Sequence, residues 1–160
     1  MVNGKNDFKL TEVKDQDLGP MSRIHALCFD DGWTSAMMKR ILAMPGAGGL
    51  VARVGWRWEI AGFVLQRVIT EECEVLSLAV SPDWRGIGIG RFLLERARWV
   101  ASDAGASRLL LEVAEDNCIA RRLYVSAGFV PVGRRPGYYS RKDGSSAAAL
   151  TMSRSLSSSQ

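Results

Sequence analysis

The sequence predicts an α/β (α+β) domain built on a mixed, mostly antiparallel sheet of six to seven strands, flanked by about four helices. Two observations lead to this fold class. Apolar segments over residues 50–54, 60–69 and 73–80 are joined by short turns, which is typical of an antiparallel meander. A long amphipathic segment then separates the third strand from another over residues 108–113, and a helical crossover of this kind makes two strands parallel. The expected order is β-α-α-β-β-β-α-β-α-β-β.

The first part of the chain is expected to form one strand and two helices. Residues 8–13 alternate between polar and apolar side chains, as a half-buried strand does. Residues 15–29 carry apolar side chains at helical spacing, namely Leu18, Met21, Ile24, Leu27 and Cys28. After an Asp-Asp-Gly break, Thr34 or Ser35 caps a second short helix over residues 34–43. We expect this helix pair to flank a site.

The second part of the chain alternates between helices and strands. The long helix, which runs to about residue 104, carries one stripe of small and apolar side chains that we expect to pack on the sheet: Gly90, Leu93, Leu94, Ala97, Val100, Ala101 and Ala104. Gly105 and Gly128 stand where helix C-caps are expected, so they end this helix and another over residues 118–127. Strands near 129–132 and 147–152 complete the sheet.

Length and cysteine content limit the class of protein. A chain of 160 residues is one domain by length, and we place that domain at residues 1–154, followed by a serine-rich, disordered tail at 155–160. The cysteines are Cys28, Cys73 and Cys118, an odd number at wide spacings with no Cys-x-x-Cys pair. They favour free thiols in a reducing compartment and give no sign of a metal site. We therefore expect a cytoplasmic protein without a metal.

Charge and hydropathy give weaker information about partners. The formal net charge is +4, but the charged residues are spread along the chain and form no basic run, so we expect a solvated surface and no direct nucleic-acid partner. The first ten residues lack the apolar core of a signal peptide, and no apolar run approaches the ~20 residues of a membrane span. We therefore expect no membrane partner, and a monomer.

The most informative local feature is a glycine-rich loop between the strand at 73–80 and the long helix. Because glycines let a ligand approach the backbone, and a helix N-terminus carries free N–H groups and a partial positive charge, this loop predicts a site for a pyrophosphate-bearing cofactor. A dinucleotide-binding loop is excluded because Arg91 stands at the third required glycine, and a nucleotide P-loop because Gly90 is followed by Arg91-Phe92. The candidate binding residues are Arg85, Gly86, Ile87, Gly88, Ile89, Gly90 and Arg91.

Three polar residues further along the chain are candidates for chemistry. Glu112 lies in a strand so apolar that its carboxylate must face water, a partner or a site. Asn117 and Tyr124 are seven residues apart and so project from nearly the same side of a helix. Each has a plainer interpretation: a solvent-facing glutamate, a helix cap and a core aromatic. Cys118 has no histidine near it in the sequence, and the sole histidine, His25, is expected to be structural.

The loop pattern Arg/Gln-x-x-Gly-x-Gly/Ala, met by Arg85, Gly88 and Gly90, resembles the acetyl-coenzyme A loop of the GNAT superfamily of N-acetyltransferases. Glu112, Asn117 and Tyr124 follow it in the order in which that superfamily carries its catalytic groups. Within the superfamily the chain resembles the RimI type, the ribosomal-protein-alanine N-acetyltransferases, over about residues 60–153. The resembling segments are Leu78-Ala79-Val80-Ser81-Pro82, the glycine loop, Leu111-Glu112-Val113, Asn117 through Tyr124, Ala127-Gly128-Phe129, Gly137-Tyr138-Tyr139 and Asp143-Gly144.

The resemblance implies a role for each matching position. It implies that Glu112 is the general base and Tyr124 the general acid, that Asn117 contacts the pantetheine arm, and that transfer is direct, without an acyl-enzyme. It implies that the backbone of Leu78, Ala79 and Val80 holds the acetyl thioester and pantetheine arm, while residues 85–91 hold the pyrophosphate. For acceptor binding the implied residues are Trp33, Tyr138 and Tyr139, the tyrosines on a covering loop. Trp33 has a second interpretation as a packing residue at a helix start.

The resemblance implies acetyl-CoA as co-substrate and an amine as acceptor. An α-amine has a pKa near 7.7–8.0 whereas lysine has one near 10.4, so a weak base such as Glu112 favours the N-terminal amine of a protein, such as a ribosomal protein. Two alternatives stay open: acetylation of lysine or of a small-molecule amine, and a non-catalytic acyl-CoA-binding protein. The chain departs from the family pattern at residues 29–33 and at Ser145-Ser146, both of which belong to acceptor recognition.

Overall fold

In the computed structural model, which describes residues 7–156, one seven-stranded sheet runs through the molecule. The strand order is β1-β2-β3-β4-β5-β7-β6. Within the described residues the elements follow the expected order, so the predicted fold class is confirmed. They are β1 (Phe8–Glu12), a 3-10 helix (Asp15–Asp17), α1 (Leu18–Cys28), α2 (Ser35–Leu42), β2 (Ala47–Val54), β3 (Glu59–Ile69), β4 (Glu72–Val80), a 3-10 helix (Pro82–Trp84), α3 (Ile89–Asp103), β5 (Arg108–Ala114), α4 (Cys118–Ser126), β6 (Val130–Ser140) and β7 (Ser146–Ser155).

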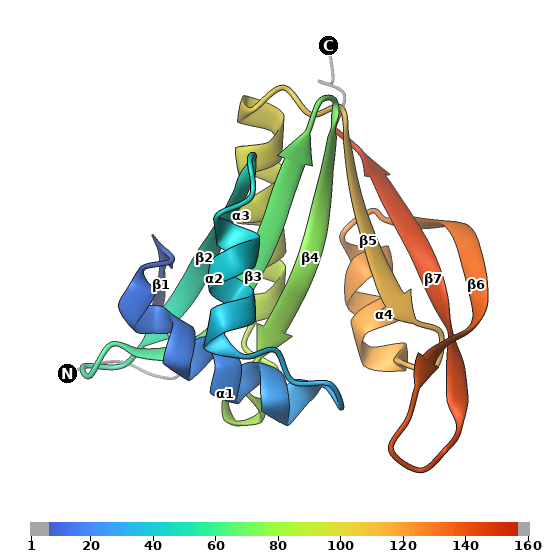
Figure 1. Ribbon diagram of the computed structural model, residues 1–160. Coiled ribbons are helices and arrows are strands. Elements are labelled where there is room, and N and C mark those ends of the chain that lie inside the picture. The colour runs from blue at the N-terminus through green and yellow to red at the C-terminus, as the bar shows by residue number, and fades with distance from the viewer. Residues whose placement is uncertain (1–6, 157–160) are drawn as a thin grey trace.

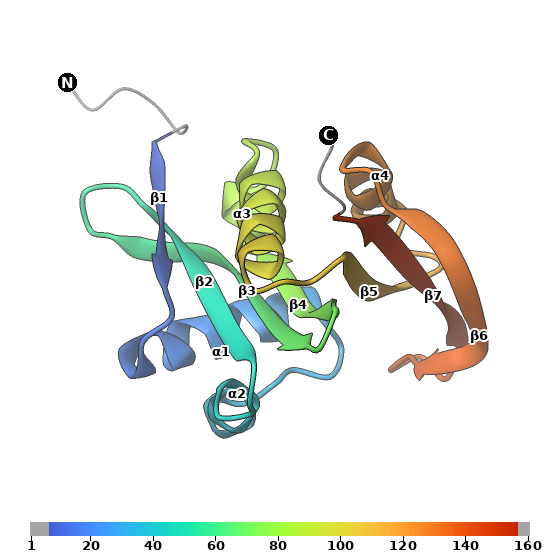
Figure 2. The same cartoon turned by 90° about the horizontal axis from the view of Figure 1, so that it is seen from above.

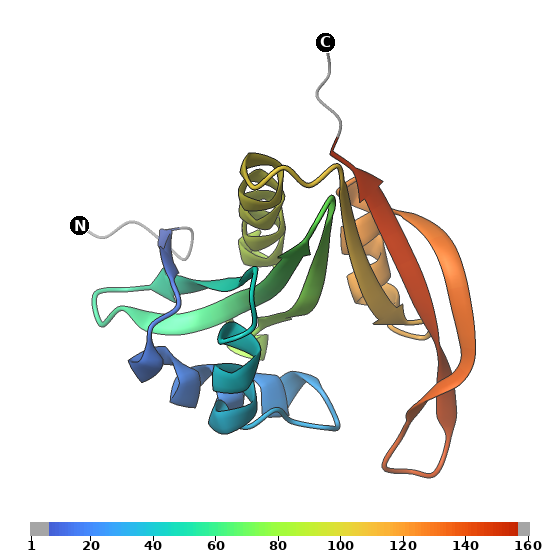
Figure 3. The same ribbon diagram turned by 45° about the horizontal axis from the view of Figure 1, so that its top comes forward.

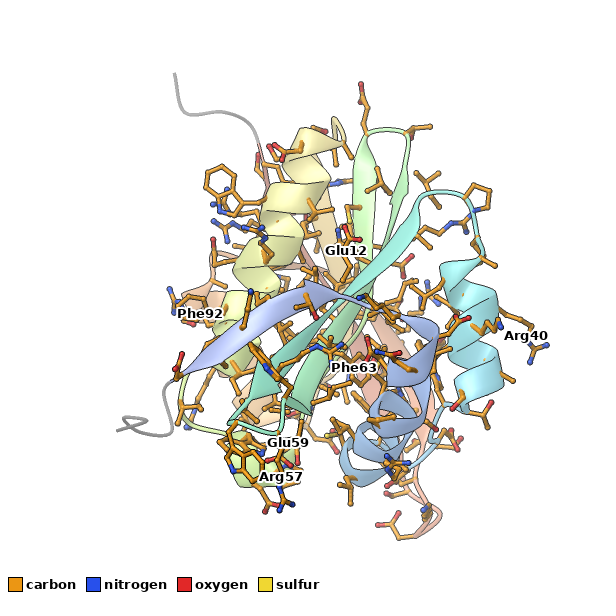
Figure 4. The ribbon with its side chains drawn as sticks, turned by 90° about the vertical axis from the view of Figure 1, so that its left-hand side faces the viewer. Glu12, Arg40, Arg57, Glu59, Phe63 and Phe92 are labelled. Atoms are coloured by element: carbon orange, nitrogen blue, oxygen red, sulfur yellow. The ribbon has the colours of Figure 1, made fainter. Side chains whose placement is uncertain are left out.

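The helices cover the sheet in two layers. Figure 2 shows α1 and α2 on one face and α3 and α4 on the other. Each layer encloses its own apolar core: Leu93, Leu94 and Tyr124 belong to the cluster under α3 and α4. Phe63, labelled in Figure 4, belongs with Leu65 to the cluster under α1 and α2. The two faces of the sheet therefore have separate interiors.

The sheet opens between its two parallel strands. β4 and β5 pair only where Glu72–Val75 of β4 lie beside Arg108–Leu111 of β5, and then diverge (Figure 1). A β-bulge marks the point of divergence, because Ser77 lies opposite Leu65 while Val75 lies opposite Gln66, which leaves Leu76 as the extra residue. Beyond Val75, the β5-facing edge of β4 makes no strand pair within the described part of the chain. This opening is accessible to groups from both faces of the sheet.

α3 packs on the sheet much as its sequence predicts. Its core-facing side chains are fully buried: Leu93, Leu94, Ala97 and Ala101. Val100 and Ala104 are exposed, so the predicted stripe was too wide at its margin. Gly105 has φ +89° and Gly128 has φ +91°, which confirms both as the left-handed residues that end α3 and α4.

The C-terminal hairpin is much longer than the sequence predicts. β6 covers Val130–Ser140, where only residues 129–132 were expected, and therefore includes Tyr138 and Tyr139, which were expected on a loop. The prolines and glycines of this segment are typical of loops, but β6 is an edge strand with two register shifts, where such residues are tolerated. β7 runs to Ser155 and Leu156 is buried, so the tail does not begin at 155; residues 157–160 lie outside the described part.

The hairpin and the α1–α2 connection project on the same side of the molecule. Both lie near the end at which β4 and β5 diverge (Figures 1 and 3). Arg57 and Glu59, in contrast, mark the tip of the β2–β3 hairpin near the opposite edge of the sheet (Figure 4). Among residues 7–156, no helix is both long and apolar enough to cross a membrane.

Leu93→Ala is expected to lower the free energy of unfolding by about 2–5 kcal/mol, because it removes a fully buried side chain and leaves a cavity between α3 and the sheet. Arg96→Ala, an exposed position on the same helix, is the control and is expected to change it by less than about 0.5 kcal/mol. Urea denaturation measures both. Equal effects of the two changes would contradict the assigned packing face.

Candidate active site

The glycine loop has the backbone geometry of an anion site. Gly86 and Gly88 have φ of +82° and +94°, and Gly88 is the N-cap of α3. A Cβ at Gly86 would meet nothing within 4 Å, and one at Gly88 only the Phe92 ring at 3.9 Å, so a ligand can approach the main chain. The N–H of Phe92 donates to the carbonyl of Gly88 over 3.0 Å as the helix begins. The backbone N–H groups of Ile89, Gly90 and Arg91 precede this first helical hydrogen bond, so they lie at the positive end of a 15-residue helix.

The two arginines of the loop secure it to neighbouring elements. Arg85 Nε donates to the carbonyl oxygen of Val80 over 3.1 Å, and its Nη2 lies 3.2 Å from Cys28 Sγ on α1. Arg91 donates to Ser126 at the end of α4, at 3.2 Å to Oγ and 3.4 Å to the carbonyl oxygen. A guanidinium has five donors, so neither arginine is exhausted by these contacts. The main chain is nevertheless the part of the loop that is open to a phosphate.

Gly90 serves packing. A Cβ at this position would lie 3.3 Å from Leu123 Cδ2 of α4 and 3.7 Å from Val80 Cγ2 of β4. The small residue therefore lets the first turn of α3 approach both α4 and the end of β4, which brings the loop close to the opening in the sheet.

Two of the predicted cofactor residues on β4 point toward the loop side of the sheet. Leu78 and Val80 pack against the cluster under α3 and α4, while Ala79 belongs to the cluster under α1 and α2. All three lie beyond Val75, in the part of β4 that has separated from β5. Their strand edge is thus positioned to pair with an extended, amide-containing ligand.

Glu112 and Tyr124 approach the opening from opposite faces. Leu111 and Val113 belong to the core under α3 and α4, so Glu112 between them points to the other face, where its side chain is 24% exposed. Tyr124 is buried in the α3 and α4 core, with its ring 5.9 Å from that of Phe129. Only where the strands have separated can groups on the two faces serve one reacting centre.

Tyr139 connects these two residues electrostatically. Burial raises the pKa of Tyr124 to about 12, and the nearby Tyr139 contributes to the rise. Burial also raises the pKa of Tyr139, and the charge of Glu112 adds to that effect. Tyr139 thus lies within electrostatic range of both Tyr124 and Glu112, and these three predicted site residues come from three different elements.

Ion pairs hold the β6–β7 hairpin to the end of β5. Arg134 contacts both carboxylate oxygens of Glu115, at 3.0 and 2.9 Å, and Arg141 pairs with Asp116. Arg135 Nη2 lies 3.2 Å from Glu112 Oε1, and the Arg135 guanidinium lies 5.3 Å from the ring centre of Tyr138. Sequence reasoning missed Arg135, because its contact with Glu112 depends on the register of β6, which no local pattern specifies.

Asn117 caps α4, as its plainer interpretation predicts. Its Oδ1 accepts from the N–H of Ala120 over 3.2 Å, which leaves the side-chain NH₂ as a donor for a ligand. On α4 itself, a hollow of about 440 Å³ is lined by Cys118, Arg121, Arg122, Val125 and Ser126. The basic rim of this hollow was not singled out from the sequence. Within the described residues no cluster of side chains suits a metal ion.

Trp33 is fixed in place by α1. Its backbone N–H donates to Nδ1 of His25 over 3.0 Å, and its backbone carbonyl accepts from Ser22 Oγ over 2.7 Å. Its indole ring stacks on the imidazole of His25, with 4.8 Å between the ring centres. Trp33 also packs against the cluster under α1 and α2. These contacts support its packing interpretation, and they confirm His25 as structural; acceptor binding by Trp33 stays a prediction.

His25 gives the protein a pH-dependent stability. Burial lowers the pKa of His25 to about 4, whereas in the unfolded chain it titrates near 6.5. The unfolded state therefore binds more protons between these values, and the free energy of unfolding falls as pH drops from 6.5 to 4, by up to about 3 kcal/mol. His25→Asn keeps an acceptor for Trp33 but does not titrate. The free energy of unfolding, measured by urea denaturation at several pH values from 6.5 to 4, should fall less for the variant than for the wild type. An equal fall in both proteins would contradict the assignment.

Gly88→Ala is expected to strain the start of α3, because Ala at φ +94° costs about 1–3 kcal/mol. The Cβ would meet only the Phe92 ring, at the ordinary contact distance of 3.9 Å, so the cost is conformational and the local backbone relaxes out of the anion-binding geometry. We expect at least a tenfold weaker affinity for acetyl-CoA by calorimetry. Gly144→Ala, with φ +86° in the β6–β7 turn and nothing within 4 Å of the added Cβ, is the control that should lose stability but not affinity.

Comparison with known proteins agrees with this geometry. The model of the acetyltransferase (GNAT) family matches residues 18–129. The chain is 33% identical over 94 residues to the ribosomal protein bS18-alanine N-acetyltransferase of Haemophilus influenzae, a match covering 59% of this chain but only 64% of that protein, which is less than two thirds of its length. It is 39% identical over 114 residues to the N-alpha-acetyltransferase RimI of Mycobacterium tuberculosis, with 69% of each chain covered.

A solved structure extends the likeness to nearly the whole fold. The crystal structure of the ribosomal-protein-S18-alanine N-acetyltransferase from Escherichia coli matches with a TM-score of 0.86 and 25% identity, covering 96% of this chain and 97% of that one. These findings confirm the resemblance seen in the sequence. The chain belongs to the acetyltransferase (GNAT) family.

Proposed function

We propose that the protein is an N-acetyltransferase that moves the acetyl group of acetyl-CoA directly to the N-terminal α-amine of a protein, with a ribosomal protein as the acceptor. The observation that carries the proposal is the opening between β4 and β5, where Glu112 and Tyr124 approach from opposite faces beside the start of α3. The relatives above are named for the same reaction, and the ribosomal acceptor is inferred from their names.

The residues present suit acetyl-CoA. The open amide groups at the start of α3 would hold the pyrophosphate. The edge of β4 at residues 78–80, apart from the Val80 carbonyl that already accepts from Arg85 Nε, would pair with the amides of the pantetheine arm. The NH₂ of Asn117 is a further donor along that path. When bound, acetyl-CoA supplies an acetyl thioester and a thiolate leaving group.

Glu112 would take up the proton that the attacking amine releases. Because an α-amine has a pKa near 7.7–8.0, much of it is neutral at physiological pH, and a carboxylate suffices as base. Arg135 Nη2, which lies 3.2 Å from Glu112 Oε1, holds the carboxylate in position. The attacking nitrogen thus loses one proton to Glu112 or to water and keeps one N–H in the product amide.

Tyr124 would stabilise the departing sulfur. With a pKa of about 12 the phenol keeps its proton throughout the working range, so it is a permanent hydrogen-bond donor. Complete proton transfer to a thiolate, whose ordinary pKa is near 8.5, would be uphill by about 5 kcal/mol. Tyr124 therefore acts mainly through the hydrogen bond, and the final proton comes from solvent.

The acceptor would lie between the α1–α2 connection and the β6–β7 hairpin, which project on the same side (Figure 3). Trp33 on the first element and Tyr138 and Tyr139 on the second are the proposed contacts. Tyr138 is 52% exposed and thus available to a peptide, while Tyr139 is less exposed and lies within electrostatic range of Glu112.

The test is a thiol-release assay with acetyl-CoA and four acceptors: the N-terminal peptide of ribosomal protein S18, the same peptide with a blocked N-terminus, a blocked peptide containing lysine, and spermidine. We expect thiol release with the first peptide alone, and a mass increase of one acetyl group at its N-terminus. Thiol release only with the lysine peptide or with spermidine would show that the acceptor is a side-chain or small-molecule amine. Binding of acetyl-CoA without any thiol release would identify a non-catalytic binding protein.

Tyr124→Phe is expected to lower kcat by about 10²-fold, because it removes the donor to the sulfur. The ring still packs on Phe129, so the affinity for acetyl-CoA and the melting temperature should change little. Steady-state kinetics and calorimetry measure the two effects. An unchanged kcat would remove Tyr124 from the reaction.

Glu112→Gln is expected to lower kcat by about 10²-fold with unchanged acetyl-CoA affinity, because the amide cannot accept the amine proton but has nearly the same shape. Glu74→Gln, an exposed carboxylate on β4, is the matched control and should keep full activity. Equal activity of Glu112→Gln and wild type would exclude Glu112 as the base.

A further inference from the structure

One buried polar group at the opening has no hydrogen-bond partner within the described residues. Ser77, on β4, is 8% exposed, and its Oγ is fully buried. A buried hydroxyl normally has a partner, and where protein supplies none the partner is usually water. Ser77 lies two residues beyond Val75, the last residue of β4 that pairs with β5.

The β-bulge decides where this hydroxyl points. Val75 packs into the core under α3 and α4, and in a regular strand Ser77 would face the same way. The extra residue Leu76 reverses it: Ser77 lies opposite Leu65, and Leu65 belongs to the core under α1 and α2. The bulge thus turns Ser77 to the face onto which Glu112 also points.

Ser77 lies one residue beyond the place on β4 that faces Glu112, because the β4–β5 register, if continued, would put Leu76 opposite Glu112. Glu112 directly follows Leu111, and Leu111 pairs with Val75. Paired strands lie about 4.8 Å apart, and these strands separate from this point onward. A gap of this kind between a hydroxyl and a carboxylate suits a bridging water, for which the unpaired edge of β4 offers further partners.

We propose that Ser77 is a positioning residue, whose hydroxyl holds the water through which Glu112 takes up the proton of the acceptor amine. The inference rests on the proposed acetyl transfer. In the step, the N–H bond of the attacking amine breaks as the water gains that proton, and the water gives one of its own protons to a Glu112 oxygen. Water is regenerated, and Glu112 later releases the proton to solvent.

If Ser77 only fills space in the core, Ser77→Ala should leave kcat unchanged. Removing an unpartnered buried hydroxyl relieves a desolvation cost, so the melting temperature should stay equal or rise. Ser153→Ala is the matched control, since Ser153 is also a buried strand serine, 7% exposed, but lies on β7 opposite Leu110, in the closed part of the sheet.

The experiment is a double-mutant cycle with Ser77→Ala and Glu112→Gln, using acetyl-CoA and the S18 peptide. Ser77→Ala is expected to lower kcat on the order of tenfold, with unchanged acetyl-CoA affinity and no loss of melting temperature. In the Glu112→Gln background the same change should have no further effect, because the relay is already broken. Ser77→Thr, which keeps the hydroxyl, should recover most of the loss, and Ser153→Ala should match wild type.

Three outcomes would overturn the inference. If wild type is active and Ser77→Ala keeps full kcat, Ser77 has no such role, while the proposed function stands. The same holds if Ser77→Ala costs as much in the Glu112→Gln background as in wild type, because the two residues then act independently. If wild type releases no thiol with any acceptor, the proposed function fails, and the relay fails with it.

Discussion

The arrangement of the whole molecule depends on one limited contact, the parallel pairing of β4 with β5. Four residue pairs join the two halves of the sheet, and the strands then diverge. If the pairing continued, the backbone edge of β4 would be consumed by β5 and the two faces of the sheet would be sealed from each other. Because it stops, the two proposed catalytic residues, Glu112 on one face and Tyr124 on the other, are not separated by a continuous sheet. The bulge at Leu76 lies at this point of divergence and also decides which way Ser77 points.

In addition to strand pairing and the apolar core, ion pairs link the C-terminal hairpin to the end of β5. Arg134, Arg135 and Arg141 on the hairpin pair with Glu115, Glu112 and Asp116 on and after β5. Single exposed pairs contribute little to stability, ~0–1 kcal/mol each, so their main effect is geometric. They set the distance between the hairpin and the end of β5, and Tyr139 on the hairpin lies within electrostatic range of Glu112. The α1–α2 side is held differently, by the buried contacts of His25 with Trp33.

Local signals in the sequence predicted the features that local physics determines. Helix ends at Gly105 and Gly128, the cap at Asn117 and the glycine loop all follow from the conformational needs of single residues, and the structure confirms them. The direction of Ser77 could not be predicted, because strict alternation places it on the face of Val75. The contact of Arg135 with Glu112 and the length of β6 were missed for a related reason: both depend on register between strands that lie far apart in the chain.

The irregular sequence of β6 also affects whether copies of the protein can pair through this edge strand. β6 forms one of the two edges of the sheet, and Val130 and Val132 are both more than half exposed there. A long apolar edge of this kind is a template for intermolecular strand pairing and hence for aggregation. Pro131 and Pro136 lack N–H groups, and the register shifts beside them distort the strand, so an incoming chain finds an incomplete row of donors. The prolines that make β6 resemble a loop in the sequence thus also make it a poor template for strand pairing with a second chain.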